Sequence, residues 1–268
     1  MHRKPLTTSF SESSASSWLG TPAIAVNLFT FAAFAAWFAL ARTVPDYQFP
    51  GPWTVLERMP DFLVDAKLRW ALTVTFGHAV AAFAIAFFVG CALAGAAYRL
   101  VLLRILIDAR ITPFLNAFSA IGWLFLAILW FGLSSLTVIF TVTMILIPFT
   151  ALNIRVGLTE LDRELIELGQ SLTTSNLLRF QKIVLPLLVP YIFATLRNSF
   201  GVCWKVVLTS ELFGGNAGLG FLLNTARQEF DTATIFAIIL FILLFNALVE
   251  TLIFRPIQNR LDRRYNVD

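Results

Sequence analysis

The sequence predicts an all-α, polytopic membrane protein with about six transmembrane helices and a cytoplasmic loop between the fourth and the fifth. The first observation is composition: 58% of the 268 residues are hydrophobic and only 13% are charged, whereas a soluble domain is about half apolar and about a quarter charged. The second is a mean hydropathy of +0.78. The third is a series of long, nearly charge-free runs, because about 20 apolar residues span a bilayer as a helix.

The same composition excludes several classes of protein. A soluble fold of this size has no core large enough to hide so much apolar surface, which argues against a water-soluble enzyme, a disordered protein or a nucleic-acid binder. The net charge of +4 fits a membrane protein, whose cations collect on the cytoplasmic side. Neither the cysteines (Cys91 and Cys203) nor the histidines (His2 and His78) show pairing or ligand spacing, so no disulfide or metal site is predicted.

The N-terminal region divides into a tail and a first span. Residues 1–21 are polar and Ser-rich and are predicted to form a flexible cytoplasmic tail, whereas residues 22–41 carry no charge. A signal peptide is the competing interpretation of the apolar run, because Ala39-Leu40-Ala41 imitates a cleavage site. A retained helix is favoured, since the hydrophobic region of a signal peptide is only about 7–15 residues long.

The second predicted span, at 70–98, follows a mixed-charge loop with several prolines at 42–69. His78 lies in this span, where a hydrogen-bonded histidine that packs helices together is favoured over a proton relay. Small residues recur every four positions, which places them on one helix face and permits close approach of another helix. These residues are Ala82, Ala86, Gly90 and Ala94.

The third and fourth spans are predicted from one uncharged stretch. A short basic loop at 99–110 precedes residues 111–154, which carry no charge and are too many for one span. Gly132-Leu133-Ser134-Ser135 has the composition of a tight turn and divides the stretch in two. Pro113 and Pro148 are expected to start or bend these helices.

The C-terminal half begins with residues 155–182, the one long polar stretch between spans. Two further spans are predicted at 183–210 and 232–254, separated by a polar connection at 211–231, and a basic tail follows at 255–268. The predicted six-span domain thus covers residues 22–254. Most Lys and Arg residues outside the spans fall on the side that holds both termini, which predicts that this side is cytoplasmic.

The 155–182 stretch combines an apolar stripe with an acidic flank. Leucines at helical spacing predict a short amphipathic helix, and Thr173-Thr174-Ser175 supplies a turn before a second helix near Asn176. Such a helix is marginal in water unless it packs on a surface. A protein partner is favoured over lipid headgroups, because the inner leaflet is itself negatively charged. The leucines are Leu161, Leu165, Leu168 and Leu172, and the acidic residues are Glu160, Glu164 and Glu167.

This stretch resembles the EAA loop of bacterial ABC importer membrane subunits. That motif reads Glu-Ala-Ala, three residues, Gly, nine residues and Ile-x-Leu-Pro; here Glu167-Leu168-Gly169, Thr173 and Ile183-Val184-Leu185-Pro186 keep the register. Leu168 and Gly169 replace the alanines, and Thr173 replaces the turn glycine. Because a β-branched residue is disfavoured at positive φ, either the turn geometry differs or the subunit pairs with a membrane subunit that carries the regular motif.

Other segments resemble the nitrate/sulfonate/taurine branch of these importers, and the resemblance covers about residues 50–262. The segments are Ile128-Leu129-Trp130-Phe131-Gly132, Leu196-Arg197 leading to Trp204, Glu211-Leu212, and Gly218-Leu219-Gly220-Phe221-Leu222.

The resemblance implies a multi-pass permease subunit in the bacterial inner membrane, with a coupling helix in the 155–186 loop. The implied partners are two cytoplasmic ABC ATPase subunits, a second copy of the chain or a paralogous permease, and an extracytoplasmic solute-binding protein. No enzymatic activity is expected, because the chain lacks the GxxxxGK[ST] phosphate loop. No cofactor is therefore expected on this chain, and ATP with Mg²⁺ belongs to the partner. The implied coupling residues are Glu164, Glu167, Leu168, Gly169, Thr173, Ile183, Leu185 and Pro186.

Polar residues inside the predicted spans are candidates for a translocation pathway. An ionisable group in mid-span costs about 2.5–3.5 kcal/mol on insertion scales, so Arg197 and Lys205 are expected to face protein or water. For Arg197, a cationic lining for an anion and an ion pair with Glu250 are both open, whereas Lys205 favours the lining. Glu211 either gates the pathway or caps the turn that follows it. The candidates are Arg197, Ser199, Lys205, Thr209, Glu211 and Asn116, with ordinary helix–helix hydrogen bonding as the alternative for Ser199, Thr209 and Asn116.

These inferences together predict the membrane-spanning permease subunit of an ATP-driven importer for a small anionic solute, such as a sulfonate, taurine, nitrate or an organic carboxylate. A secondary active transporter of a small anion is the alternative, but it gives no reason for the register across 155–186. A membrane-embedded enzyme would need a cluster of His, Asp or Cys at the bilayer edge, and the sequence has none.

Overall fold

The computed structural model describes residues 21–45, 47–161, 171 and 175–265, and every regular element within them is a helix. In chain order these elements are α1 (Thr21–Ala41), α2 (Pro52–Glu57), α3 (Asp61–Val64), α4 (Ala66–Arg99), α5 (Val101–Leu106), η1 (Ile107–Ile111), α6 (Thr112–Ala117), α7 (Ala120–Phe131), α8 (Ser135–Glu160), α10 (Asn176–Arg179), η2 (Phe180–Val184), α11 (Leu185–Gly214), α12 (Leu219–Gln228), α13 (Thr232–Val249), η3 (Glu250–Phe254) and α14 (Arg255–Tyr265). The elements η1, η2 and η3 are π-helical turns.

The all-α membrane architecture is confirmed, although six spans are slightly more than the structure shows. Four helices within the described residues are long and apolar enough to cross a membrane: Ala66–Tyr98, Ser135–Glu160, Phe180–Gly214 and Thr232–Arg264. A fifth span results if the bent pair of helices ending at Phe131 counts as one. The N-terminal helix contributes a shorter apolar segment, Asn27–Ala41.

The predicted third span differs from the observed structure because the chain breaks at Phe118 and Ser119. Phe118 is extended, and Ser119 caps α7 by accepting a hydrogen bond from the backbone N–H of Gly122. The helices on the two sides of this break are bent by 80°. The basic loop predicted at 99–110 is also wrong, because these residues form α5 and most of the π-helical turn η1.

The core forms where α4, α8 and α11 pack together. The predicted stripe of small residues on α4 is buried, as expected for a close helix contact. At Gly90, a Cβ atom would lie 2.8 Å from Cβ of Thr150 on α8, closer than side-chain atoms pack. Thr143 Oγ1 donates a hydrogen bond of 3.5 Å to the carbonyl oxygen of Ala82. Small residues therefore let the backbones of α4 and α8 approach each other, as in other membrane helices.

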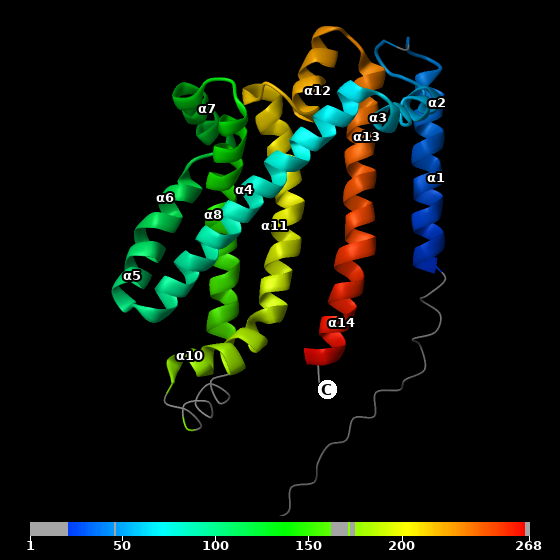
Figure 1. The fold of residues 1–268 in the computed structure, drawn as a ribbon. Helices are drawn as coiled ribbons and strands as arrows, with labels where there is room; N and C mark the ends of the chain where they lie inside the picture. The colour runs from blue at the N-terminus through cyan, green and yellow to red at the C-terminus, as the bar shows by residue number, and fades with distance from the viewer. Residues whose placement is uncertain (1–20, 46, 162–170, 172–174, 266–268) are drawn as a thin grey trace, which may run out of the picture.

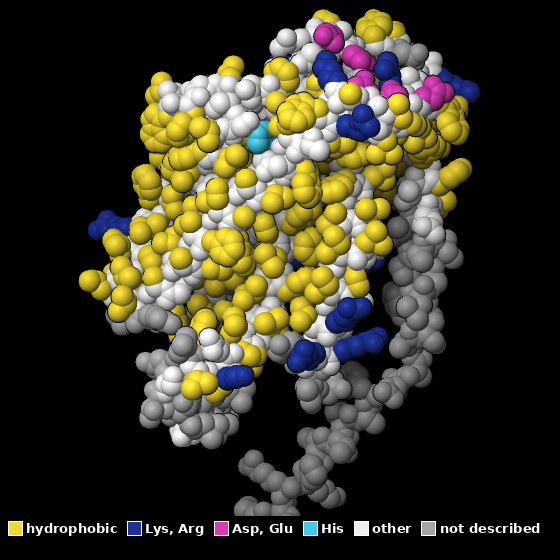
Figure 2. Space-filling view, in the orientation of Figure 1, with side chains coloured by type: hydrophobic (Ala, Val, Ile, Leu, Met, Phe, Trp, Pro, Cys, Tyr) yellow, Lys and Arg dark blue, Asp and Glu magenta, His cyan; other side chains and the backbone are white. Residues whose placement is uncertain are grey.

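The two ends of the bundle carry different elements (Figure 1). At one end lie α10, the end of α14 and the start of α1, and at the other lie α2, α3, α7 and α12. Figure 2 shows hydrophobic side chains over the faces of the long helices, with most of the charged side chains gathered near the two ends. This distribution is that of a chain whose middle lies in hydrocarbon and whose ends lie in the aqueous interfaces.

Candidate functional site

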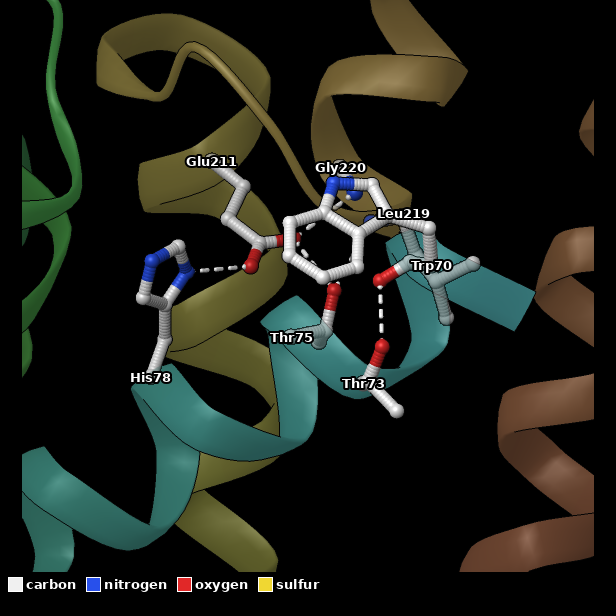
Figure 3. Close-up of polar contacts among 7 residues, drawn as sticks. All are labelled: Trp70, Thr73, Thr75, His78, Glu211, Leu219 and Gly220. Carbon is white, nitrogen blue, oxygen red and sulfur yellow. Dashed lines mark hydrogen bonds and ion pairs between the residues drawn. The ribbon is translucent and has the colours of Figure 1, made fainter. Parts of the chain in front are cut away.

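A buried carboxylate, that of Glu211, joins three helices near the end of the bundle that carries α12 (Figure 3). Its side chain is 0% exposed. Oε1 lies 2.7 Å from Nδ1 of His78, and Oε2 accepts hydrogen bonds from Oγ1 of Thr75 at 2.8 Å and from the backbone N–H of Gly220 at 2.9 Å. An ionised carboxylate only accepts, so His78 Nδ1 is the donor of this pair in the state in which Glu211 is ionised. The carboxylate is therefore fully coordinated by hydrogen-bond donors of the chain.

Each group in this cluster is positioned by its helix. Thr75 and His78 extend the buried stripe of α4, three residues apart and thus on one face. Thr75 Oγ1 also accepts the backbone N–H of Leu219 at 2.7 Å. The first N–H groups of α12, which have no partner within the helix, are thus satisfied by α4 and α11. We call Thr75, His78, Glu211, Leu219 and Gly220 the Glu211 cluster.

Glycines shape the turn between α11 and α12. Gly218, the N-cap of α12, has φ 107° and ψ 177°, a region that is essentially open only to glycine. A Cβ at Gly218 would overlap the carboxyl group of Glu211, and one at Gly220 would lie 2.5 Å from Glu211 Cβ. These glycines lie in the turn that joins α11 to the short helix α12. The space that the glycines leave open is filled by the carboxylate.

The sequence left two roles open for Glu211, a gate of the pathway or a cap of the turn that follows it. In the structure it caps the helix that follows the turn, with its hydrogen bonds directed to α12 and α4. The prediction of a hydrogen-bonded, helix-packing histidine at His78 is also confirmed. Thr75 was missed by the sequence analysis. Its signal is that it lies one helical turn before His78 on the face that continues to Ala82.

Arg197 forms an ion pair with Glu250 that joins α11 to the π-helical turn η3. Nε donates to Oε2 at 3.3 Å, and Nη2 donates to Oε1. The contact is bidentate, which fixes the planes of both groups. The two side chains are 37% and 36% exposed. The ion pair with Glu250, one of the two alternatives for Arg197, is present in the structure.

Lys205 lies on an exposed polar stripe of α11. Lys205 and Thr209 are both exposed, and Thr209 Oγ1 donates to the carbonyl oxygen of Lys205 at 3.0 Å. Asn198, which the sequence analysis did not single out, is exposed one heptad before Lys205. Positions separated by seven and four residues lie on one helix face. These three residues, Asn198, Lys205 and Thr209, are called the α11 polar stripe.

Ser199 and Asn116 lie apart from this stripe. Ser199 is buried, and its Oγ has no hydrogen-bond partner among the described residues. Asn116 is exposed on α6 and lines a cavity of about 180 Å³ together with Ala94, Ala151 and Arg155. The structure therefore does not bring all candidate pathway residues to one place.

The coupling segment predicted at 155–186 is described in part: residues 155–160 continue α8 instead of starting a loop, and the structure resumes at Ser175 after the single residue Ser171. Ile183 belongs to η2, Leu185 begins α11, and Pro186 occupies the first turn of α11, where its missing N–H removes no helical hydrogen bond. Val184, between them, is buried against α8 residues Ile154 and Leu158. The predicted coupling residues Glu164, Glu167, Leu168, Gly169 and Thr173 lie outside the described residues.

Asp231 marks the start of α13 near the Glu211 end of the bundle. Its carboxylate accepts hydrogen bonds from the backbone N–H of Thr234 at 3.1 Å and from Thr234 Oγ1 at 2.6 Å. Burial alone would raise the pKa of Asp231, but the two hydrogen bonds and the nearby Arg58 guanidinium outweigh it and lower the pKa.

Within the described residues, no group of three or more His, Cys, Asp or Glu side chains is arranged to hold a metal ion.

Known proteins resemble this chain in both sequence and fold. It is 27% identical over 217 residues to a probable ABC transporter permease protein of Brucella melitensis biotype 1, covering 80% of this chain and 86% of that protein. It is 25% identical over 232 residues to the taurine transport system permease protein TauC of Escherichia coli (strain K12), covering 84% of each. A crystal structure of an amino acid ABC transporter with histidines has the same fold, with a TM-score of 0.60 at 18% identity, covering 79% of this chain and 97% of that one.

The family assignment follows from a separate match that covers more than half of the chain. Residues 82–266 match the family described as "Binding-protein-dependent transport system inner membrane component". The taurine relative lies within the nitrate, sulfonate and taurine type that the sequence resembles, so the predicted resemblance is confirmed. The chain belongs to the family of binding-protein-dependent transport system inner membrane components.

Proposed function

We propose that this chain is the permease subunit of an ATP-driven importer, that it couples to a separate ATPase through residues 155–186, and that it conducts a small anionic solute. The observation that carries the proposal is the register of the EAA-type motif from Glu167 to Pro186 in a chain of this family. ATP hydrolysis would reside in the partner subunits, because this chain has no phosphate loop.

The fold supports the coupling role through the position of the described part of the segment. α10 and η2 lie at the end of the bundle where α14 ends and α1 begins (Figure 1). Both α8 and α11 extend from this segment into the membrane, and they pack against each other along the core. A force applied to this segment would act directly on α8 and α11. If these two helices have two arrangements, nucleotide bound to the ATPase would favour one of them, and this is what allosteric coupling requires.

Charge reversal tests the coupling. We expect Glu167→Lys to abolish uptake and solute-stimulated ATP hydrolysis in vesicles that contain the complete transporter, because the substitution places a cation on the acidic flank. The matched control is Glu229→Lys, an exposed acidic position in the C-cap of α12 at the other end of the bundle. Both variants should insert in normal amounts. Wild-type uptake by Glu167→Lys would contradict the coupling role of this residue.

The α11 polar stripe supports an anionic solute. An exposed lysine in mid-span is costly when it faces lipid, by about 2.5–3.5 kcal/mol on insertion scales. Lys205 would therefore face water or a second permease subunit, and its charge would favour an anion. We place the pathway along Asn198, Lys205 and Thr209, with the ion-paired Arg197 beside it as a helix-joining residue.

A charge series at Lys205 tests this choice of solute. In vesicles that contain the complete transporter, uptake of taurine and of nitrate should fall in the order wild type, Lys205→Gln, Lys205→Glu, because each step removes positive charge from the pathway. The control is Lys67→Gln, which removes an exposed lysine from the first turn of α4, away from the α11 polar stripe. Equal uptake by Lys205→Gln and Lys205→Glu would show that charge at this position does not act on the solute.

The remaining partners follow from the same proposal. A second permease subunit, either another copy or a paralogue, would close the pathway, and a solute-binding protein would deliver the solute at the end that carries α2 and α12. That end would face away from the cytoplasm, because the opposite end carries the Arg-rich α14 and cationic segments remain inside.

A further inference from the structure

An apolar cavity lies between α4, α11 and α13, next to the Glu211 cluster, with which it shares Leu219. Its volume is about 250 Å³, and its walls are formed by Leu72, Thr73, Phe76, Trp204, Leu219, Phe241, Ile242 and Phe245. The α4 side of the cavity is open to the surroundings, since Phe76 is half-exposed and Thr73 is exposed. All of these residues belong to helices at membrane depth, except Leu219 at the start of α12.

The lining is unfavourable for a polar solute. Four of the eight lining residues are aromatic, and Trp204 packs edge-on against Phe245 with ring centroids 4.9 Å apart. The hydroxyl of Thr73 is already used by its own helix, because it donates to the carbonyl oxygens of Arg69 and Trp70, the second of which Figure 3 draws. The Nε1–H of Trp204, which is buried without a partner among the described residues, is the one side-chain donor left on the lining. A single donor does not replace the hydration that an anion would lose in this cavity.

The size of the cavity favours a slender occupant. Pockets that bury a drug-sized molecule measure about 300–1,000 Å³, which is more than this cavity offers. A single hydrocarbon chain needs little width and makes no polar demands, so it fits a narrow cavity with apolar walls that opens at the side of a spanning helix. Lipid chains surround this surface in a bilayer.

A cation precedes the cavity-lining residues of α4 by one helical turn. Arg69, Leu72, Thr73 and Phe76 have the spacing i, i+3, i+4 and i+7, which places them on one face of α4. Arg69 is exposed in the first turn of α4, and no ion-pair partner for its guanidinium is found among the described residues. The neighbouring Trp70 is 67% exposed, as is typical of an aromatic residue at the headgroup level. A guanidinium at this level matches the geometry of a phosphate.

We propose that this cavity, with Arg69 one helical turn before its α4 lining, holds a phospholipid, whose phosphate binds Arg69 and one of whose acyl chains enters between α4 and α13. The proposal does not depend on the transported solute or on the coupling segment. It predicts that an anionic phospholipid is bound more tightly than a zwitterionic one, because a basic residue at the membrane surface adds attraction to anionic headgroups.

Lipid titration of the detergent-purified full chain tests the proposal, with bound lipids counted by native mass spectrometry. The two probes are dioleoylphosphatidylglycerol and dioleoylphosphatidylcholine. Arg69→Gln should weaken the binding of phosphatidylglycerol by about fivefold and that of phosphatidylcholine by less. Ile242→Trp, which fills the cavity, should weaken the binding of both lipids. Lys67→Gln is the matched control, because Lys67 lies two residues from Arg69 and so on the opposite face of α4, and it should bind both lipids as the wild type does.

Two outcomes would overturn the proposal. Equal loss of phosphatidylglycerol in Arg69→Gln and Lys67→Gln would mean that only general surface charge attracts the lipid. A change in the association of permease subunits in Ile242→Trp, with lipid binding unchanged, would mean that a second copy occupies the cavity. Arg69 is an exposed side chain, so Arg69→Gln decides the question even if Ile242→Trp does not fold.

Discussion

Substitution of Gly218 by alanine should destabilise the end of the bundle that carries α12 more than any other single methyl group added to the α11–α12 turn. The reason is that Gly218 combines a backbone conformation closed to other residues with direct overlap between its missing Cβ and the carboxyl group of Glu211. Neither problem is relieved by moving a flexible side-chain tip, because the carboxyl group is held by three hydrogen bonds.

The expected magnitude comes from two terms. Holding alanine in this backbone region costs about 1–3 kcal/mol. Displacing the carboxylate breaks hydrogen bonds to a buried charged group, for which about 2 kcal/mol is a moderate figure. Together they lower the free energy of unfolding by about 3–5 kcal/mol, which corresponds to a fall in Tm of about 10 °C for a chain of this size.

The measurement is thermal unfolding of the purified chain in detergent, followed by tryptophan fluorescence. Gly77→Ala is the matched control, because Gly77 lies on α4 beside His78 and a Cβ there meets nothing within 4 Å. Its Tm should remain the same or rise slightly, as helix propensity favours alanine over glycine.

A double substitution separates the two terms. In a Glu211→Ala background the carboxyl group is absent, so Gly218→Ala should then cost only the backbone term of about 1–3 kcal/mol. If Gly218→Ala lowers the Tm equally in the two backgrounds, the carboxylate does not occupy the space that the glycine leaves, and the reasoning fails.

Three further predictions concern other contacts. In a double-mutant cycle of Arg197→Gln and Glu250→Gln, unfolding should reveal a coupling of about 1 kcal/mol, limited by partial exposure of both side chains; additive effects would contradict a working ion pair. Gly90→Ala should destabilise the chain by about 1–3 kcal/mol because it overpacks the contact of α4 with α8, whereas Gly95→Ala, where a Cβ meets nothing within 4 Å, should not lower the Tm. Asp231 has a lowered pKa in the folded chain, so its contribution to stability is complete above its unfolded pKa of about 3.9 and is lost as the pH falls through the lower folded value. Asp231→Asn should reduce the loss of stability between pH 7 and pH 3 in unfolding measurements. If the variant loses as much stability at low pH as the wild type does, Asp231 is not responsible for this part of the pH dependence.

The spans that depend on long uncharged runs could be predicted from the sequence, whereas the break in the third could not. The predicted spans at residues 135–154 and 232–254 lie within the observed helices Ser135–Glu160 and Thr232–Arg264. The break at Phe118 and Ser119 lies within an apolar run, and its cause is a single hydroxyl that caps α7. Serine inside a span is also compatible with an unbroken helix, so hydropathy alone does not distinguish the two cases.

The Glu211 cluster was accessible from the sequence only in pieces. Glu211 and His78 were each singled out, and Gly218 and Gly220 were part of the family resemblance. His78 and Glu211 are 133 positions apart, and nothing in the sequence shows that their side chains meet. The alternatives for Arg197 remained open for the same reason, since its partner Glu250 is 53 residues away. Residue type indicates that a buried charge needs a partner, and only the packing of α4, α11 and η3 decides which one.

The sharing of one carboxylate by α4, α11 and α12 has a consequence for how the bundle deforms. Hydrogen bonds to this carboxylate connect the three helices at one end, so they should tilt together as a rigid unit. Any bending of the bundle must then occur at another place. The opposite end contains η2, in which each carbonyl pairs with an amide five residues on and the ladder is wider and weaker than in an α-helix. Compliance should therefore be concentrated in the turn Phe180–Val184, and its backbone amides should exchange with deuterium faster than those of the braced stretch before Gly214. Uniform exchange along α11 would show that the rod bends evenly.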